Sequence, residues 1–183
     1  MAAEGWIAGA RRVPSPNCDG RPAGAAVDLL VLHSISLPRG VYGSDAGGDP
    51  IEQLFTNRLD PAAHPSFAGL AGLRVSSHFL IRRSGSLVQF VPLQARAWHA
   101  GLSRWRGRER CNDHSIGVEL EGTDDGAFAA AQYESLAKLA GRLAAGLPLR
   151  AVAAHSDVAP GRKTDPGTRF DWARFLRELA RRS

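Results

Sequence analysis

Two short apolar runs along the chain each end in a histidine. Leu29–Leu32 is uninterrupted and is followed by His33, and Ala151–Ala154 is followed by His155. Continuous apolar runs of this length are typical of strands that are buried on both faces. Functional groups of α/β proteins gather where such strands give way to loops. We therefore predict two buried strands that carry both histidines to one edge of a sheet.

Three further segments have strand-like patterns. Residues 78–82 and 86–91 flank Ser84–Gly85, which predicts a β-hairpin with its turn at that dipeptide. Residues 115–121 alternate, with apolar side chains at the even positions and serine, glycine or glutamate at the odd ones. This period of two predicts a strand whose two faces have different surroundings.

Helical periodicity appears in the second half of the chain. Apolar residues recur every three or four positions over 133–143 and over 172–179, so each segment predicts a helix with one buried face. Asp171 is placed to cap the C-terminal helix. A shorter helix is expected near 51–56. Strands and helices together predict an α/β fold, with a central mixed sheet flanked by helices.

The remaining segments are polar or rich in glycine and proline. Residues 38–50 and 98–113 are predicted to be loops rather than linkers, because strand-like segments lie close on both sides. Apolar residues make up 44% of the 183 residues and charged residues 22%, which permits a packed core. We expect a single domain over 1–183.

Composition also bounds location and partners. No apolar run approaches the roughly 20 residues that span a bilayer, and the first residues do not have the pattern of a secretory signal. Two cysteines are too few for a disulfide framework. These features predict a cytoplasmic protein that does not associate with membranes. We also expect a monomer. The net charge is +5, and all of the basic residues except Lys138 and Lys163 are arginines. It indicates either a solvated surface or attraction to an acidic ligand, and not nucleic acid, because no nucleic-acid-binding motif accompanies it.

His33, His155 and Asp165 form a candidate metal-ligand set. Two imidazoles and one carboxylate are a common set for catalytic zinc, with a fourth position left open. Asp165 lies ten residues after His155 and is followed by Pro166–Gly167, which would turn the chain sharply. The spacing is loose, and a single histidine is more often structural than a ligand.

Three charged residues could act beside such a metal. Glu119 and Glu121 share one face of a largely apolar strand. An inward carboxylate is costly to bury and therefore needs a reason. One of them is a candidate general base, although a polar outer face explains either, and the pattern does not choose between them. Lys163 lies two residues before Asp165 and is a candidate for oxyanion stabilisation. The alternative is a surface lysine.

These residues, together with their neighbours in the sequence, make the chain resemble a known family. It is similar to the AmpD-type 1,6-anhydro-N-acetylmuramyl-L-alanine amidases, which share their fold with the peptidoglycan recognition proteins. The resemblance covers nearly the whole chain, through these blocks: Gly5–Trp6, Ala10–Pro16, Leu32–Pro38, Asp60–Pro65, Arg74–His78, Ala97–Gly101, Gly107–Asp113, Ser115–Thr123, Ala154–Pro160 and Arg162–Gly167.

The resemblance implies Zn²⁺ at the positions of His33, His155 and Asp165. It also implies that Glu119, not Glu121, is the catalytic base, and that Lys163 stabilises the transition state. The implied substrate is an anhydromuropeptide from cell-wall turnover. The implied reaction cuts the amide between the lactyl group of 1,6-anhydro-N-acetylmuramic acid and L-alanine.

Substrate contacts are expected from the same blocks. Arg74, Arg110 and Arg162 are candidates to hold stem-peptide carboxylates, and Trp98 is a candidate to stack on the sugar. His78 and His99 either line the pocket or support loops. The candidates also include Ser34, which stands where the family has asparagine.

Two other functions fit the same fold. One is a muropeptide-binding module without activity, and the other is an amidase that acts on intact peptidoglycan. The complete ligand set argues against the first, and the lack of a secretory signal against the second.

Overall fold

A central six-stranded sheet organises the molecule. The computed structural model describes residues 5–43 and 48–181. The sheet has the order β1-β5-β4-β9-β3-β10. Its strands are β1 (Arg11–Arg12), β3 (Leu29–Ile35), β4 (Phe79–Ile81), β5 (Leu87–Gln89), β9 (Ser115–Glu121) and β10 (Ala151–Ala154).

The sheet is mixed, and its central part is parallel. Strands β4, β9, β3 and β10 run in one direction, whereas β5 is antiparallel to β4. The β4–β5 hairpin turns at Ser84–Gly85, where Gly85 has a φ of 84° and its N–H donates to the Arg82 carbonyl. Because parallel strands end at the same edge, β3, β9 and β10 bring their C-terminal residues together.

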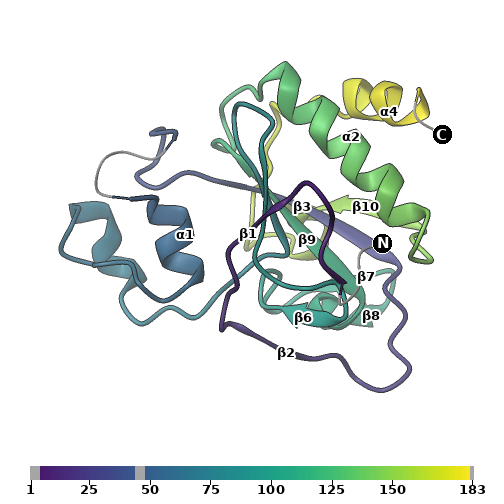
Figure 1. The fold of residues 1–183 in the computed structure, drawn as a ribbon, viewed down its shortest axis with the longest axis horizontal. Coiled ribbons are helices and arrows are strands. Elements are labelled where there is room, and N and C mark those ends of the chain that lie inside the picture. Colours follow the sequence, from purple (N-terminus) through teal and green to yellow (C-terminus); the bar gives the residue numbers. More distant parts are fainter. Residues whose placement is uncertain (1–4, 44–47, 182–183) are drawn as a thin grey trace.

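Two helices cover one face of the sheet. Helices α2 (Ala130–Ala144) and α4 (Trp172–Ala180) pack against each other, as Figure 1 shows for the green and yellow ribbons. Leu136 and Leu139 of α2 and Phe175 of α4 belong to the same buried cluster as Leu30 and Leu32 of β3. Asp171 caps α4 by accepting a hydrogen bond from the Arg174 N–H.

The opposite face is covered by shorter elements. Helix α1 (Pro50–Phe55) places Leu54 and Phe55 in a cluster with Leu80 of β4. Helix α3 (His155–Val158) follows β10 directly and adds Val158 to a third cluster. With both faces covered, every residue of β9 is buried. This explains why the glutamates on its odd positions do not face solvent.

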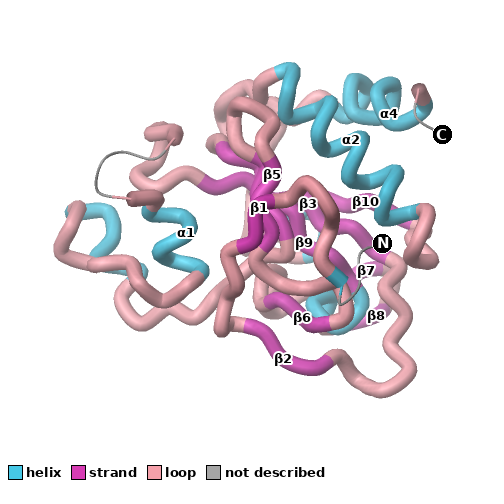
Figure 2. The backbone as a smooth tube through the Cα atoms, in the orientation of Figure 1, coloured by secondary structure: helices cyan, strands magenta, loops and turns pink. Residues whose placement is uncertain are grey.

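Several short elements lie outside the main sheet (Figure 2). Strand β2 (Cys18–Gly20) pairs with β6 (Ala95–Ala97), and β7 (Arg104–Trp105) pairs with β8 (Arg108–Glu109). Two 3₁₀ helices cover Pro65–Leu70 and Cys111–His114. The prediction of a plain loop over 98–113 was therefore wrong, because that stretch holds the β7–β8 hairpin and most of a 3₁₀ helix.

The α/β fold with a central mixed sheet flanked by helices is confirmed. Helix α1 begins inside the segment predicted as a loop over 38–50, and residues 44–47 of that segment lie outside the described residues. No helix in the described ranges is long and apolar enough to span a membrane.

Candidate metal centre and catalytic site

The strand register brings the candidate ligands together. Leu32 of β3 pairs with Ala154, the last residue of β10, so His155 comes next to His33, which lies two residues before the end of β3. On the other side of β3, His33 pairs directly with Glu119 of β9. Side chains opposite each other in a parallel pair share a face of the sheet. His33 and Glu119 therefore lie on the face covered by α1 and α3.

His33, His155 and Asp165 converge on one point. Their contacting atoms are 2.9 Å apart for the two Nδ1 atoms, 3.2 Å for His33 Nδ1 to Asp165 Oδ2, and 3.0 Å for His155 Nδ1 to Asp165 Oδ2. Both histidines are almost fully buried. Two nitrogen lone pairs and a carboxylate oxygen that face one another are relieved by a cation, so this group has the composition and closeness of a metal site.

The electrostatics favour the protonation states that bind metal. Burial lowers the pKa of His33 to about 4, so its imidazole is neutral at pH 7. Burial alone would raise the pKa of Asp165, but hydrogen bonds with His155 and His33 outweigh it and lower that pKa. A neutral histidine and an ionised aspartate are the states that a metal ion requires of its ligands.

The backbone around Asp165 fixes its carboxylate. The Ser156 N–H at the start of α3 donates to the Asp165 carbonyl at 3.0 Å, which ties the ligand to the element that carries His155. Gly167 has a φ of 93°, and a Cβ there would lie 1.7 Å from the Asp124 carbonyl oxygen. The chain turns sharply after Asp165, as predicted, because only glycine allows this close approach.

The two glutamates of β9 have different surroundings. The carboxylate of Glu121 accepts hydrogen bonds from the backbone N–H groups of Gly43 and Arg83 and forms an ion pair with Arg82. The carboxylate of Glu119 receives no hydrogen bond from any residue in the described ranges. Burial raises its pKa well above the usual value, with Asp165 adding to the rise and Lys163 opposing it. Glu119 is therefore free to exchange a proton with a ligand, and Glu121 is not.

Two cavities meet at the metal group. The apolar cavity, of about 250 Å³, is lined by His33, Glu119 and Trp98 together with apolar side chains such as Leu73 and Val75. The polar cavity has a volume of about 400 Å³. Its lining includes Arg39, Thr123, Asp124, Arg162 and Thr164. Ser34, Ile35, Lys163 and Asp165 line both cavities. A ligand that lies across the metal group can thus place chemically different parts on its two sides.

The three candidate arginines lie in different settings. Arg162 lines the polar cavity but also donates to the carbonyls of Ala100 and Leu102. Arg110 is exposed, pairs with Asp113, and lines a separate hollow beside Arg162. Arg74 is exposed, between two residues that line the apolar cavity.

The two uncertain histidines have distinct positions. His99 lines the apolar cavity, and its Nδ1 lies 2.9 Å from His33 Nε2. His78 is fully buried and accepts a hydrogen bond from the Gly117 N–H, so it supports the sheet instead. Sequence reasoning missed Thr123 and Asp124 of the polar cavity. Their position just after β9 could have indicated them, since functional groups gather at such strand ends.

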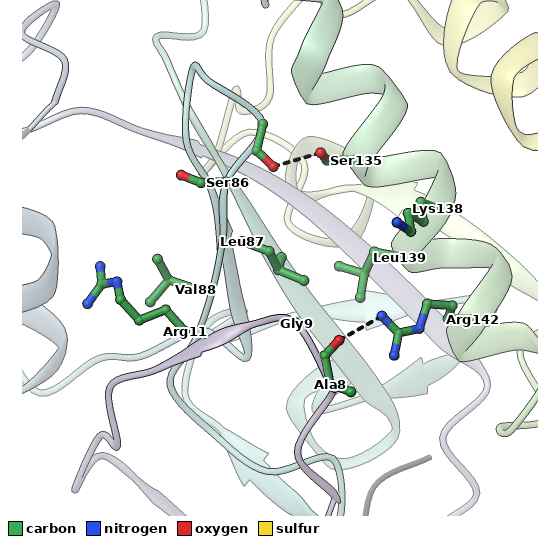
Figure 3. A pocket seen from close by; sticks show the side chains of 11 residues that line it. Ala8, Gly9, Arg11, Ser86, Leu87, Val88, Ser135, Lys138, Leu139 and Arg142 are labelled. Atoms are coloured by element: carbon green, nitrogen blue, oxygen red, sulfur yellow. Dashed lines mark hydrogen bonds between the residues drawn. The ribbon is translucent and has the colours of Figure 1, made fainter.

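Another cavity, of about 430 Å³, lies away from the metal group. It is formed between Ala8–Gly9, the β4–β5 turn and α2, and Figure 3 shows Lys138 and Arg142 along its α2 side. Arg142 donates to the Ala8 carbonyl, and Ser135 donates to the Gly85 carbonyl. None of the predicted site residues lines it.

Comparisons with known proteins agree with this geometry. Residues 23–168 match the family model of N-acetylmuramoyl-L-alanine amidase. The chain is 57% identical over 174 residues to the 1,6-anhydro-N-acetylmuramyl-L-alanine amidase AmpD of Citrobacter freundii, a match that covers 94% of this chain and 91% of that protein. The corresponding AmpD of Haemophilus influenzae is 43% identical over 176 residues, with 94% of each chain covered.

Solved structures give the same result. A crystal structure of a selenomethionine AmpD derivative superposes with a TM-score of 0.93 at 54% identity, covering 98% of this chain and 99% of that one. The Escherichia coli amidase AmiD, solved with anhydro-N-acetylmuramic acid-L-Ala-D-γ-Glu-L-Lys, gives a TM-score of 0.61 at 30% identity, covering 86% of this chain and 60% of that one. The chain therefore belongs to the N-acetylmuramoyl-L-alanine amidase family and is of the AmpD type.

Proposed function

We propose that this protein is a zinc-dependent amidase of peptidoglycan recycling. It hydrolyses the amide bond between the lactyl group of 1,6-anhydro-N-acetylmuramic acid and L-alanine in anhydromuropeptides. The observation that carries the proposal is the convergence of His33, His155 and Asp165 beside Glu119, a buried carboxylate without a hydrogen-bond partner in the described ranges.

The names of the relatives support the choice of substrate. Proteins 43–57% identical over almost their whole length are named as amidases of 1,6-anhydro-N-acetylmuramyl-L-alanine. The more distant AmiD has been solved with an anhydromuramyl peptide as its substrate. The two cavities that meet at the metal group suit such a ligand, because it has a sugar at one end and a peptide at the other.

His33, His155 and Asp165 would hold the zinc ion. When bound, zinc acts as a Lewis acid that lowers the pKa of water toward 7 and polarises a carbonyl group. The protein's contribution is to keep the His33 imidazole neutral through burial and the Asp165 carboxylate ionised through its hydrogen bonds with His155 and His33.

Glu119 would carry out the proton transfers. It accepts a proton from the attacking water and then delivers it to the departing amine of L-alanine. Its raised pKa suits the first transfer, because a carboxylate that holds a proton more tightly than usual is a stronger base toward the attacking water. Lys163 lines both cavities and would stabilise negative charge that develops on the lactyl carbonyl oxygen.

The candidate substrate-binding residues lie in or beside the two cavities. Trp98 would provide an aromatic surface in the apolar cavity, and Ser34 a hydroxyl at the junction of the two cavities. Arg162 would act from the polar cavity, where it is held by two carbonyls. Arg74 and Arg110 are exposed and would reach only the outer part of a bound peptide.

Metal content and product analysis test the proposal together. The purified protein should contain about one zinc per chain and release a peptide beginning with L-alanine from anhydromuropeptide, identified by mass spectrometry. Asp165→Ala should lose both zinc and activity. Asp157→Ala is a matched control, because this carboxylate only caps the start of α3. A protein that binds the muropeptide without cleaving it would be a binding module instead, and a fully active, zinc-free Asp165→Ala would refute the mechanism.

A second assay tests the substrate range. Anhydromuropeptide and purified sacculi should be compared at equal concentrations of the amide bond. Efficient cleavage of sacculi would favour a broader wall amidase over a recycling enzyme.

We further propose a single domain over 1–183, acting as a cytoplasmic monomer. Strand β1 and helix α4 lie outside the matched residues 23–168, yet they join the same sheet and the same core, which supports one domain. Two free cysteines suit a reducing compartment. Cell fractionation and sedimentation velocity would test location and oligomeric state.

A further inference from the structure

A chain of hydrogen bonds leads from the metal group into the protein through His99. His33 directs Nδ1 toward His155 and Asp165, and its Nε2 lies 2.9 Å from His99 Nδ1. His99 Nε2 lies 3.2 Å from Ser115 Oγ, and this hydroxyl donates to the Cys111 carbonyl at 2.6 Å. Each step has hydrogen-bonding distance.

The direction of this chain follows from chemistry alone. A neutral imidazole has one N–H donor and one lone pair. If His33 Nδ1 binds metal, its Nε2 must carry the hydrogen, so His99 Nδ1 must accept. His99 Nε2 then carries its own hydrogen and donates to Ser115, whose hydroxyl proton is directed to a carbonyl. Every donor in the chain has an acceptor.

Ala100, the residue after His99, supports His155, the second histidine of the metal group. His155 Nε2 lies 3.4 Å from the carbonyl oxygen of Ala100, while its Nδ1 faces the metal group. The side chain of Asn112 accepts hydrogen bonds from the backbone N–H groups of both His99 and Ala100, at 3.1 and 2.8 Å. One dipeptide, held by one asparagine, thus lies behind both imidazoles.

Gly117 provides the space for the His99 ring. A Cβ at this position would lie 2.6–2.8 Å from three atoms of the ring. Gly117 is buried in β9 and pairs with Val31 of β3, two residues before His33. A glycine within a central strand weakens that strand unless another group needs the close approach. Here that group is the imidazole of His99.

We infer that His99 is a positioning residue that fixes the ring orientation and tautomer of the zinc ligand His33, with Asn112 and Gly117 holding His99 in place. The inference rests on the proposed metal function. Outer partners of this kind raise metal affinity because they pre-orient the ligand before the metal arrives.

Zinc affinity of three variants tests the inference. His99→Leu removes the acceptor and should weaken zinc binding by about 10- to 100-fold. His99→Asn retains an acceptor near the position of Nδ1 and should recover most of that loss. Gly117→Ala leaves all polar groups intact but displaces the ring, so it should also weaken zinc binding. The dissociation constants are measured by competition with a chromophoric chelator, and the Co²⁺-substituted proteins should differ in their ligand-field absorption spectra.

Separate measurements keep the outcomes distinct. Thermal unfolding of the metal-free variants shows whether a loss of zinc affinity merely reflects a damaged fold. Ser115 lies at the far end of the hydrogen-bond chain from the metal group, so Ser115→Ala should lower zinc affinity less than His99→Leu does. If the wild type binds zinc, Asp165→Ala does not, and His99→Leu binds it within about twofold of wild type, only the role of His99 is refuted. If His99→Asn is as weak as His99→Leu, the acceptor is not what matters, which also refutes it. A wild-type protein that binds no zinc would overturn both this inference and the proposed function.

Discussion

Glu119 and Glu121 are chemically identical side chains on the same face of β9, but their different hydrogen-bond partners give them different roles. Glu121 satisfies two backbone N–H groups and Arg82, while Glu119 has no such partner among the described residues. We expect Glu119→Gln to lower kcat/KM by about 10²- to 10⁴-fold, the usual contribution of a general base. Zinc content should be unchanged, because glutamine replaces a residue that is not in the ligand group. Steady-state kinetics and metal analysis measure these two effects.

Glu121→Gln is the matched control for that substitution. Its amide cannot replace the charge beside Arg82, so we expect a loss of about 1–3 kcal/mol in the free energy of unfolding, measured in urea. Its kcat/KM should stay within a few-fold of wild type. Equal losses of activity in the two variants would contradict the separate roles of the glutamates.

His78 should make stability depend on pH. Its Nδ1 accepts from the Gly117 N–H, its Nε2 faces the Ala95 carbonyl and Arg21, and the His99 ring lies 5.9 Å away. Burial, and next the Arg21 charge, lower its pKa to about 3. Below pH 6.5 the unfolded chain gains a proton that the folded state refuses, so stability falls as the pH falls toward 3.

The size of this effect follows from the pKa difference. Each pH unit below 6.5 costs about 1.4 kcal/mol, or about 2 kcal/mol at pH 5. His78→Asn keeps an acceptor for Gly117 but does not titrate in this range. Urea unfolding of the metal-free proteins at pH 7 and pH 5 should therefore show the gap between wild type and variant shrinking by about 2 kcal/mol. Parallel pH dependences would rule out His78 as the source.

Residue types and order could indicate the ligand set but not all of the site. His33 and His155 could be found because each directly follows an apolar run, and Asp165 because it precedes a turn signal. The choice between the glutamates depends on strand register, which a single strand's pattern does not contain. His99 lies in a loop, Asn112 in a 3₁₀ helix and Gly117 within a strand, and their role appears only when these segments meet.

At the scale of elements, one arginine connects helix α1 to the sheet. Arg82, just after β4, forms ion pairs with Asp49, which caps α1, with Glu52 in the first turn of α1, and with Glu121 of β9. Removing it leaves three carboxylates together without this cation. We expect Arg82→Met to destabilise the fold by about 3 kcal/mol, since breaking a buried ion pair is far more costly than breaking an exposed one.

Arg11→Met provides the comparison for this effect. Arg11 also pairs with Glu52, but its side chain is 57% exposed. We expect a loss below about 1 kcal/mol, because solvent screens exposed pairs. Both changes are measured by urea unfolding. If Arg11→Met lowers the free energy of unfolding as much as Arg82→Met does, burial does not explain the contribution of Arg82 to stability.

Length decides which elements could be predicted. The strand of residues 115–121, the helices near 133–143 and 172–179, and the capping role of Asp171 could be predicted because each has a full period of its own pattern. Strands β1, β2, β6, β7 and β8 have two or three residues each, too few to show a period. Strands β4 and β5 are also short, but the turn signal Ser84–Gly85 between them made their hairpin predictable. The pairing of β1, β2, β6, β7 and β8 is set by partners from elsewhere in the chain, so the sequence around them does not reveal them.

At the scale of the whole molecule, the proposed zinc ion would join three parts of the chain that only folding brings together. His33 and Asp165 are separated by 132 positions, and the ion would link β3, the start of α3 and the segment after it. A ligand that binds only the folded state stabilises it by about 2.7 kcal/mol at a concentration 100 times its dissociation constant. For a chain of this length, that corresponds to a rise of about 5–10 °C in Tm.

Chelator and zinc titrations followed by thermal unfolding measure this coupling. The wild-type Tm should rise with zinc and fall with chelator, whereas the Tm of Asp165→Ala should respond to neither. The starting Tm of the variant should lie close to that of the metal-free wild type, because Asp165 is held largely by groups that themselves would bind the metal. A zinc-dependent rise of the same size in Asp165→Ala would mean that the stabilising ion binds elsewhere, since the carboxylate that completes the group would then contribute nothing to its affinity.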